Sequence, residues 1–501
     1  MDAILYWNDV ALEANRVSHT NGKEEQTGPT LSSRALAIVH LAMYDAFVGV
    51  MPSGFDPYLT TPIVPAAKPG ASAAAAIAAA AHATLSLLFP SQKPFFDLKH
   101  AEAGIAGTGQ KEGHDFGLAI ANRILDLRKN DPPVGDDGYA ASTARGAHRA
   151  DPDNPGQGFH GPFYGAQSAC FAATTRHALA PPPAVSTAPG DYRRALRQVR
   201  AKGIAPELMG TVTPAMRRTV NETLIGVYWA YDGASGLGTP PRLYNQIVRR
   251  VAENQKNSLE QNARLFALVN TAMGDAGILA WEQKYKHDLW RPVVGIREHD
   301  PSMVPTGIAG NIINDDSDPG WLPLGAPETN SAKMEKNFTP PFPAYPSGHA
   351  TFGAAAFHIT RLFYDSSLIG DTSRDDFFKD DMDIDLSFVS DELNGVSRDN
   401  KGTVRPKHVR SFPDGLWQMI LENGLSRVYL GVHWVFDSFA VNANGTPDLA
   451  QKKVGGVPLG IAIAEDICTS GMLAAKAAPP AEPAMPFSSV TLPSRKAWPM
   501  G

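Results

Sequence analysis

Apolar residues recur at every third or fourth position along most of this chain, which is the spacing of amphipathic helices. Leu36, Val39, Met43 and Phe47 form one such series. The pattern predicts helices over residues 4–12, 36–47, 71–89, 116–127, 215–231, 242–267, 268–290 and 416–439, and one more that begins near residue 347. The single-residue alternation that is typical of strands is hard to find. We therefore expect an all-α protein.

Three stretches interrupt the helical pattern. Residues 131–190 are rich in Pro, Gly and His, which predicts extended loops. The acidic stretch 371–385 has the charge for a calcium loop but lacks the glycine and terminal glutamate of an EF-hand, so we expect a solvated surface loop. From Ala477 onward the Pro-rich sequence predicts a disordered or surface-draped tail.

Composition and charge narrow the class of protein. The chain is 43% hydrophobic and 19% charged, with a net charge of −6, as in ordinary soluble proteins. Because no block of Lys and Arg dominates any segment, nucleic-acid binding is not expected. Cys170 and Cys468 lie far apart and lack the CxxC spacing of zinc or redox sites.

Neither the beginning of the chain nor its most apolar stretch predicts a membrane segment. The first 16 residues lack the basic start and continuous apolar run of a signal peptide. Residues 70–89 are mostly alanine, include His82 and end at Pro90, which favours a soluble helix over a membrane span. The compartment stays open between the cytoplasm and secretion by a non-standard route.

Candidate chemistry begins with Lys284 and Arg291, followed by Pro292. The two cations are seven residues apart, which on a continuous helix places both on one face. Such a pair alone is usually a solvated helix face. Stacked cations repel each other, however, unless an anion lies between them.

A second segment, Pro346-Ser347-Gly348-His349, has the features of an anion-binding helix start. Pro346 suits the first position of a helix, Ser347 adds a hydroxyl, and Gly348 lets the backbone approach a ligand closely. The free N–H groups and the positive end of the helix dipole favour an anion. His349 could exchange protons there. A simple helix cap beside a histidine is the alternative.

The third segment contains Arg427, Gly431, His433 and Asp437. Arg427 and His433 are six apart, so either the long arginine reaches round a helix or the helix is interrupted near Gly431. Asp437, four residues after His433, can accept one ring N–H and orient the imidazole. The other ring nitrogen is then free to bond a metal or phosphorus centre. A purely structural His–Asp pair is the alternative.

Together these residues suit one tetrahedral oxyanion. Three cations balance its charge, and arginine side chains bind its oxygens in pairs. In this interpretation His433 forms the covalent bond, and His349 handles protons on the opposite side.

The three motifs, Lys-x6-Arg-Pro, Pro-Ser-Gly-His and Ser-Arg-x5-His, resemble the signature shared by vanadium haloperoxidases and the type 2 phosphatidic acid phosphatase superfamily. Outside the motifs the chain resembles fungal vanadium chloroperoxidases over roughly residues 4–475. The similar segments are ILYWNDVALEANRVSHT, TGPTLSSRALAIVHLAMYDA, GPFYG, YWAYDG, GTPPRLYNQIVRR, PFPAYPSGHATFG and GVPLGIAIA. This chain is shorter after His433 and has a different tail, which puts the entry channel and surface loops in doubt.

The resemblance implies a fold of two four-helix bundles within one large domain, residues 1–475, followed by a tail, 476–501. An N-terminal half would span about 1–200, and a half with the site about 201–475. The implied function is a vanadate-dependent haloperoxidase, which oxidises chloride or bromide with hydrogen peroxide to hypohalous acid. The organic acceptor, if any, the halide preference and the oligomeric state stay open.

The resemblance also assigns roles to residues of this chain. His433 would be the vanadium ligand, and His349 the acid/base. Trp281 and Phe342 would form an apolar halide pocket, with phenylalanine at 342 favouring chloride. Asp232 would pair with a site arginine. The residues implied to hold the vanadate oxygens are Lys284, Arg291, Ser347, Gly348 and Arg427, with Lys284 also acting on bound peroxide.

Two other functions compete with this one. An acid phosphatase would use His433 as nucleophile and His349 as general acid. An oxyanion-binding protein without turnover is the third alternative. Trp281, Phe342 and the similar flanking segments favour the haloperoxidase.

Overall fold

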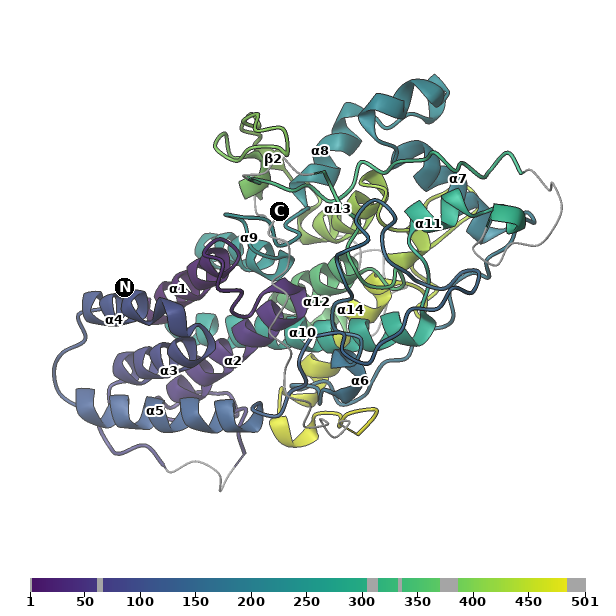
Figure 1. Ribbon diagram of the computed structural model, residues 1–501. Coiled ribbons are helices and arrows are strands. Elements are labelled where there is room, and N and C mark those ends of the chain that lie inside the picture. The colour runs from purple at the N-terminus through teal and green to yellow at the C-terminus, as the bar shows by residue number, and fades with distance from the viewer. Residues whose placement is uncertain (1, 61–65, 304–313, 332–335, 370–385, 484–501) are drawn as a thin grey trace.

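The computed structural model describes residues 2–60, 66–303, 314–331, 336–369 and 386–483. Helices dominate this part of the chain, which confirms the predicted α class (Figure 1). The α-helices are α1 (Ala3–Ser18), α2 (Gly28–Val48), α3 (Ala73–Leu88), α4 (Lys93–Glu102), α5 (Gln110–Leu127), α6 (Tyr164–Gln167), α7 (Asp191–Lys202), α8 (Val220–Tyr228), α9 (Pro240–Asn254), α10 (Leu259–His287), α11 (Pro292–Arg297), α12 (Gly348–Tyr364), α13 (Gly415–Tyr429) and α14 (Gly456–Ser470). Two small antiparallel ribbons pair β1 (Ser387–Phe388) with β2 (Arg410–Ser411), and β3 (Ala440–Val441) with β4 (Pro447–Asp448).

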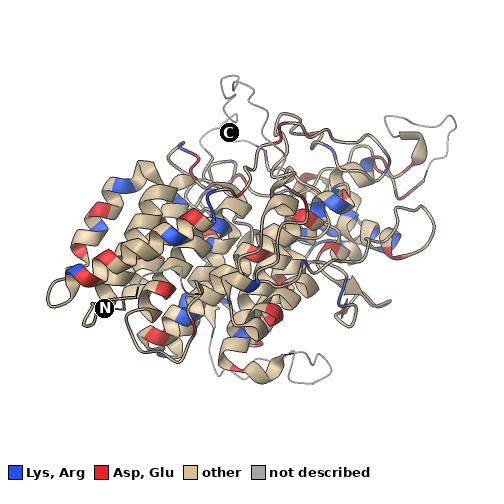
Figure 2. Cartoon of the chain, turned by 90° about the horizontal axis from the view of Figure 1, so that it is seen from below, with Lys and Arg blue, Asp and Glu red and all other residues tan. Residues whose placement is uncertain are grey.

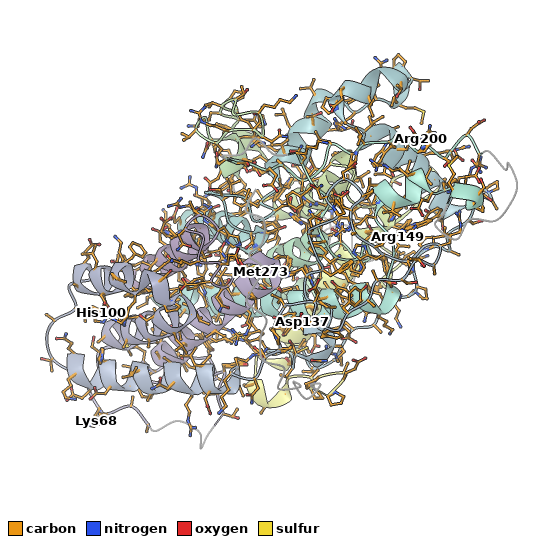
Figure 3. All side chains as sticks on the ribbon, viewed as in Figure 1. Lys68, His100, Asp137, Arg149, Arg200 and Met273 are labelled. Carbon is orange, nitrogen blue, oxygen red and sulfur yellow. The ribbon has the colours of Figure 1, made fainter. Side chains whose placement is uncertain are left out.

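The long helix α10 connects two groups of packed helices. On one side α2 packs on α10 and α3, and α3 packs on α5. On the other side α12 packs on α10, α13 and α14 (Figure 1). Met273, in the middle of α10, is fully buried and lies near the centre of the molecule (Figure 3). The division into four-helix bundles stays a prediction, but α10 holds the N-terminal and C-terminal helices together.

The predicted boundary between helices 242–267 and 268–290 is wrong. The break lies at residues 255–258, where α9 has ended and α10 has not begun. Ser258 caps α10, and the Gln261 side chain accepts a hydrogen bond from the Ser258 backbone N–H at 2.8 Å. This capping box starts a helix of 29 residues that runs through the expected break.

Other predictions need smaller corrections. The predicted helix 215–231 begins only at Val220, after the Thr219 cap, and ends at Tyr228. Helices α4, α7, α11 and α14 were not predicted. Helices α4 and α11 are short, and the first two turns of α14 are apolar on nearly every side, so these three show no clear amphipathic period. Helix α7 is strongly charged, which obscures its apolar positions. The acidic stretch 371–385 and the end of the tail lie outside the described residues. The start of the tail lies against the protein, where Ala478 is buried.

The predicted loop region 131–190 is confirmed apart from the short α6. Part of this loop is held on α10 by Asp275, a buried carboxylate. It accepts hydrogen bonds from the backbone N–H groups of Phe171, Ala172 and Ala173. A loop with few helical hydrogen bonds of its own is thereby fixed next to the long helix.

Charged residues of both signs lie on the outer helices (Figure 2), and the most apolar long helix is buried. Blue and red residues alternate along the outer helices in Figure 2, without a face of one sign in that view. Among the described helices, α2 is long and apolar enough to cross a membrane by composition, but 83% of its apolar window is buried inside the protein. That burial is what a core helix shows. Cys170 and Cys468 are both free thiols.

Candidate active site

His433 lies in a turn that follows α13, because the helix ends at Tyr429 and Gly431 adopts a left-handed backbone, φ +76°. The predicted helix 416–439 is therefore wrong beyond residue 429, and the interruption near Gly431 is confirmed. The Arg427 carbonyl accepts hydrogen bonds from the N–H groups of both Val432 and His433. This bend turns His433 back toward the end of α13.

Asp437 orients the His433 ring, as its spacing predicts. One carboxylate oxygen, Oδ2, lies 2.8 Å from His433 Nδ1 and accepts from the Trp434 backbone N–H at 2.9 Å. Since a carboxylate only accepts, Nδ1 has the proton and Nε2 is left with a lone pair. Burial raises the pKa of Asp437 to about 7, while Lys284 and Arg291 oppose that shift.

Arg291 meets His433 directly. Its Nη1 lies 2.9 Å from His433 Nε2 and also donates to the Val432 carbonyl, while Nε donates to the Phe342 carbonyl. The predicted shared helix face with Lys284 is wrong, because α10 ends at His287 and Arg291 caps the next helix, α11. The two cations converge from separate elements instead.

Lys284 is fully buried at the end of α10. Its Nζ donates to three carbonyls, of Pro343 at 2.9 Å, Ala344 at 3.2 Å and Pro346 at 2.5 Å. Burial, followed by repulsion from Arg291, lowers the pKa of Lys284, and Asp437 opposes this. All three ammonium N–H groups thus have partners, so Lys284 must release one carbonyl to contact a bound anion directly.

The start of α12 lies beside these cations. Pro346 was expected at the first position of this helix, but α12 begins at Gly348 and Ser347 is its cap. Ser347 Oγ accepts from the Ala350 N–H, and the Ser347 N–H donates to the Asp437 carbonyl. A Cβ added at Gly348 would lie 3.3 Å from the Trp281 ring, which leaves little room for a side chain there.

His349, in the first turn of α12, is buried and neutral. Burial, and then Arg427, lowers its pKa to about 3. Its Nε2 lies 2.6 Å from the Ala230 carbonyl. A carbonyl can only accept, so Nε2 has the proton and Nδ1 has the lone pair.

Arg427 projects from α13 onto Asp232, the pairing that the family resemblance implies. Both terminal nitrogens, Nη1 at 3.0 Å and Nη2 at 2.7 Å, donate to the Asp232 carboxylate. Asp232 Oδ1 also lies 3.9 Å from His349 Nε2. This two-pronged ion pair fixes the plane of the Arg427 guanidinium.

The apolar wall forms where it was expected. The rings of Trp281 and Phe342 lie 4.7 Å apart, and the Lys284 ammonium and Arg291 guanidinium lie 5.0 Å and 4.9 Å from the Phe342 ring centre. His160 completes the wall, with its ring 5.9 Å from Trp281 and 6.2 Å from Phe342.

The residues present fit an oxyanion. Arg291 Nη2 and Arg427 Nε are buried N–H donors without a hydrogen-bond partner in the described part of the chain. Leaving such a donor unpaired costs about 1–3 kcal/mol, more when it is charged. Among the residues that the structure describes, three buried cations face two carboxylates, Asp232 and Asp437, so an anion would both balance the charge and accept from the free donors. We name the set that surrounds this position the oxyanion cradle: Lys284, Arg291, Ser347, Gly348, Arg427 and His433.

Comparison with known proteins identifies the family. A family model described as the vanadium chloroperoxidase N-terminal domain matches residues 1–159, and one described as the VCPO second helical-bundle domain matches residues 264–453. A relative, the vanadium chloroperoxidase of Curvularia inaequalis, is 35% identical to this chain in an alignment that covers 96% of this chain and 92% of the relative. The chain belongs to the vanadium chloroperoxidase family. Because residues 160–263 lie between the two models, the division near residue 200 stays a prediction.

Solved structures share the vanadium chloroperoxidase fold at low identity. A bacterial vanadium-dependent iodoperoxidase superposes with a TM-score of 0.63 at 18% identity, covering 92% of this chain and 95% of that one. The apo form of a bacterial vanadium-dependent chloroperoxidase gives 0.57 at 15% identity, covering 88% and 95%. At these identities the likeness supports the fold alone.

Sequence reasoning missed several groups that hold this chloroperoxidase-family site together. The Ala230 carbonyl fixes the His349 tautomer, and backbone groups leave no sequence signal. Tyr244 and Asn423 both donate to the His349 carbonyl, at 3.3 Å and 2.7 Å. His160 directly precedes the GPFYG segment, which could have pointed to it, but a histidine in a Pro/Gly-rich loop usually indicates surface.

Proposed function

We propose that this chain is a vanadate-dependent haloperoxidase that uses hydrogen peroxide to oxidise halide to hypohalous acid. One observation supports this most: His433, with Nδ1 held by Asp437, presents Nε2 beside the unpaired donor of Arg291. A histidine ligand oriented by a carboxylate is a common arrangement at metal sites. Family membership supports the same reaction.

In this proposal the oxyanion cradle holds vanadate. His433 Nε2 would be the ligand, and Arg291, whose Nη1 now lies 2.9 Å from that nitrogen, would donate to the oxyanion. Arg291 Nη2 and Arg427 Nε provide the charged donors that the protein itself leaves unpaired. When bound, vanadate would supply a Lewis acid that activates peroxide while vanadium stays at +5. Neither haem nor flavin is then needed.

His349 acts as the base of the reaction. With the proton on Nε2 committed to Ala230, its Nδ1 can take the proton of incoming hydrogen peroxide. A neutral imidazole is needed for this step, and the lowered pKa of His349, caused mainly by burial, keeps it neutral without a bound anion. A negative charge nearby would raise that pKa toward the range where the proton can also be returned.

We further propose that chloride is a substrate. A halide at the Trp281–Phe342 wall would lose its water on the apolar side while remaining near Lys284 and Arg291. Chloride is harder to dehydrate than bromide, so its use depends on these compensating cations. Phenylalanine at 342 keeps the wall apolar.

The first experiment is halogenation of monochlorodimedone by the vanadate-free protein with peroxide and chloride, before and after addition of orthovanadate. We expect activity only after orthovanadate, and less of it when phosphate competes during reconstitution. Activity with bromide but not chloride would leave the cofactor assignment standing and refute the chloride proposal. No halogenation with either halide, together with hydrolysis of p-nitrophenyl phosphate that vanadate inhibits, would support the phosphatase alternative.

A further inference from the structure

The turn at Tyr228–Asp232, here the site turn, provides two separate contacts to the active site. Its Ala230 carbonyl accepts from His349, and its Asp232 carboxylate pairs with Arg427. Between them, Tyr231 has a left-handed backbone, φ +46°. For a residue with a bulky side chain this conformation is strained by about 1–3 kcal/mol, so neighbouring structure must maintain it.

A second turn, Ser390–Glu392, holds the site turn at several points and is here the acidic turn. Ser390 Oγ donates to the Tyr228 carbonyl at 2.7 Å. The Asp391 N–H donates to the Tyr231 hydroxyl at 2.8 Å. The strained Tyr231 N–H points at Glu392 Oε1, 3.4 Å away. The acidic turn therefore contacts the site turn before and at the strained residue.

Glu392 is held in place from the opposite side. It is fully buried, and its other oxygen, Oε2, accepts from Thr329 Oγ1 at 2.6 Å and from Arg405 Nη1 at 2.7 Å. Burial raises the pKa of Glu392 to about 7; Arg405 opposes this, and Asp232 adds to it. A buried carboxylate is unfavourable unless it is paired, and here Arg405 and Thr329 provide the partners that keep Glu392 in place.

We propose that Glu392 is a positioning residue for the active site, acting through the Tyr231 backbone on both Ala230 and Asp232. Among the described residues, the hydrogen bonds of Glu392 go to Tyr231, Thr329, Ser390 and Arg405, and none joins it to the oxyanion cradle or to His349. By fixing the site turn it sets the tautomer of His349 and the plane of Arg427 at once. The inference rests on the proposed function, because Glu392 is expected to change the affinity of the oxyanion cradle for orthovanadate.

The test compares three variants with a matched control. Glu392→Met keeps the length of the side chain and removes the acceptor, whereas Glu392→Gln keeps an acceptor for the Tyr231 N–H. Asp45→Leu is the control, because Asp45 is equally buried and also accepts from backbone N–H groups, those of Tyr58 and Leu59, away from the site. Thr329→Val is a milder variant, which removes the hydrogen bond that Thr329 donates to Glu392 and the one that it accepts from Arg405, and leaves the Glu392 carboxylate in place.

The readouts are the dissociation constant of orthovanadate for the vanadate-free protein, by calorimetry, and the ¹⁵N shifts of the His349 ring. We expect Glu392→Met to weaken binding about 10-fold and to mix the His349 tautomers, since one lost orienting contact is typically worth that factor. Glu392→Gln should stay within about 3-fold of the unaltered protein, and Thr329→Val should lie between them. Asp45→Leu should lower the unfolding temperature without changing either readout.

Several results would overturn the inference. Binding and ring shifts unchanged in Glu392→Met would do so, and so would equal losses in Asp45→Leu, which would indicate a general stability effect. If Glu392→Met does not fold, unchanged binding in Thr329→Val overturns it. An unaltered protein that fails to bind orthovanadate would instead refute the proposed function, so the two failures are distinguishable.

Discussion

At the scale of single residues, the two site histidines have opposite ring nitrogens committed to the protein. The His433 Nδ1–H donates a hydrogen bond to Asp437, and the His349 Nε2–H donates one to the Ala230 carbonyl. Each ring therefore presents one lone pair, on Nε2 of His433 and on Nδ1 of His349. One lone pair suits a ligand bond and the other suits a proton transfer. The role of each histidine depends on the group that accepts its ring N–H, so replacing that group tests the role.

Asp437→Asn tests the partner of His433. The amide oxygen can still accept from Nδ1 and from the Trp434 N–H, so the shape is kept while the negative charge beside Lys284 and Arg291 is lost. We expect orthovanadate to bind about 10- to 100-fold more weakly, the usual effect of removing a carboxylate behind a histidine ligand. The measurement is a calorimetric titration of the vanadate-free protein. Asp45→Asn, equally buried and remote, is the control, and equal affinities in both variants would contradict the role assigned to Asp437.

At the scale of elements, helix ends decide where the functional groups lie. Arg291 and Ser347 are helix caps, Lys284 is in the last turn of α10, and His433 follows the end of α13. The sequence motifs predicted the residues correctly, because residue types and spacing report chemistry. They did not predict the breaks at residues 255–258 and 288–291, since apolar periodicity continues across a break that a cap creates. Lys284 and Arg291 were expected to lie together on one face of a continuous helix. They do lie together, but from the end of α10 and the cap of α11.

Gly431→Ala tests the bend after α13. Gly431 has φ +76°, and a Cβ there would lie 2.4 Å from the Gly203 carbonyl oxygen, too close without a backbone shift. Gly471, φ +90°, has open space around it and is the matched control. We expect Gly471→Ala to lower the free energy of unfolding by about 1 kcal/mol, the cost of the left-handed conformation alone. Gly431→Ala should lose more in urea unfolding and should also weaken orthovanadate binding, because His433 moves with the bend. Equal losses and equal binding would show that the bend does not position His433.

At the scale of the whole molecule, burial brings together titratable groups that the sequence could not pair. Helical periodicity predicted that His40 and His349 lie within helices, but not that both would be enclosed by side chains from distant segments. Asn8 and Asn245 illustrate this, since their side chains are hydrogen-bonded across 237 positions of sequence. Long-range polar contacts of this kind need the tertiary packing first. The overall pH dependence of stability is therefore a property of the fold and not of any motif.

That pH dependence can be worked out in sign. Burial lowers the pKa of six deeply buried histidines, and it raises the pKa of three buried carboxyls to about 7. The histidines are His19, His40, His148, His160, His349 and His433, and the carboxyls are Asp45, Glu392 and Asp437. Near pH 5.5, unfolding lets the six histidines bind about six protons and makes the three carboxyls release about three. The unfolded chain therefore binds about three protons more than the folded protein.

The vanadate-free protein should therefore lose about 4 kcal/mol of unfolding free energy per pH unit as the pH falls from 6.5 toward 4.5, and should change little above pH 8. Urea unfolding at pH 5, 6, 7 and 8 measures this slope. His40→Gln removes one of the six histidines far from the site and should reduce the uptake to about two protons. A free energy of unfolding that stays constant between pH 5 and 7 would mean that these histidines gain protons in the folded state. Zero net uptake would require about three of the six to do so, which would refute the predicted slope.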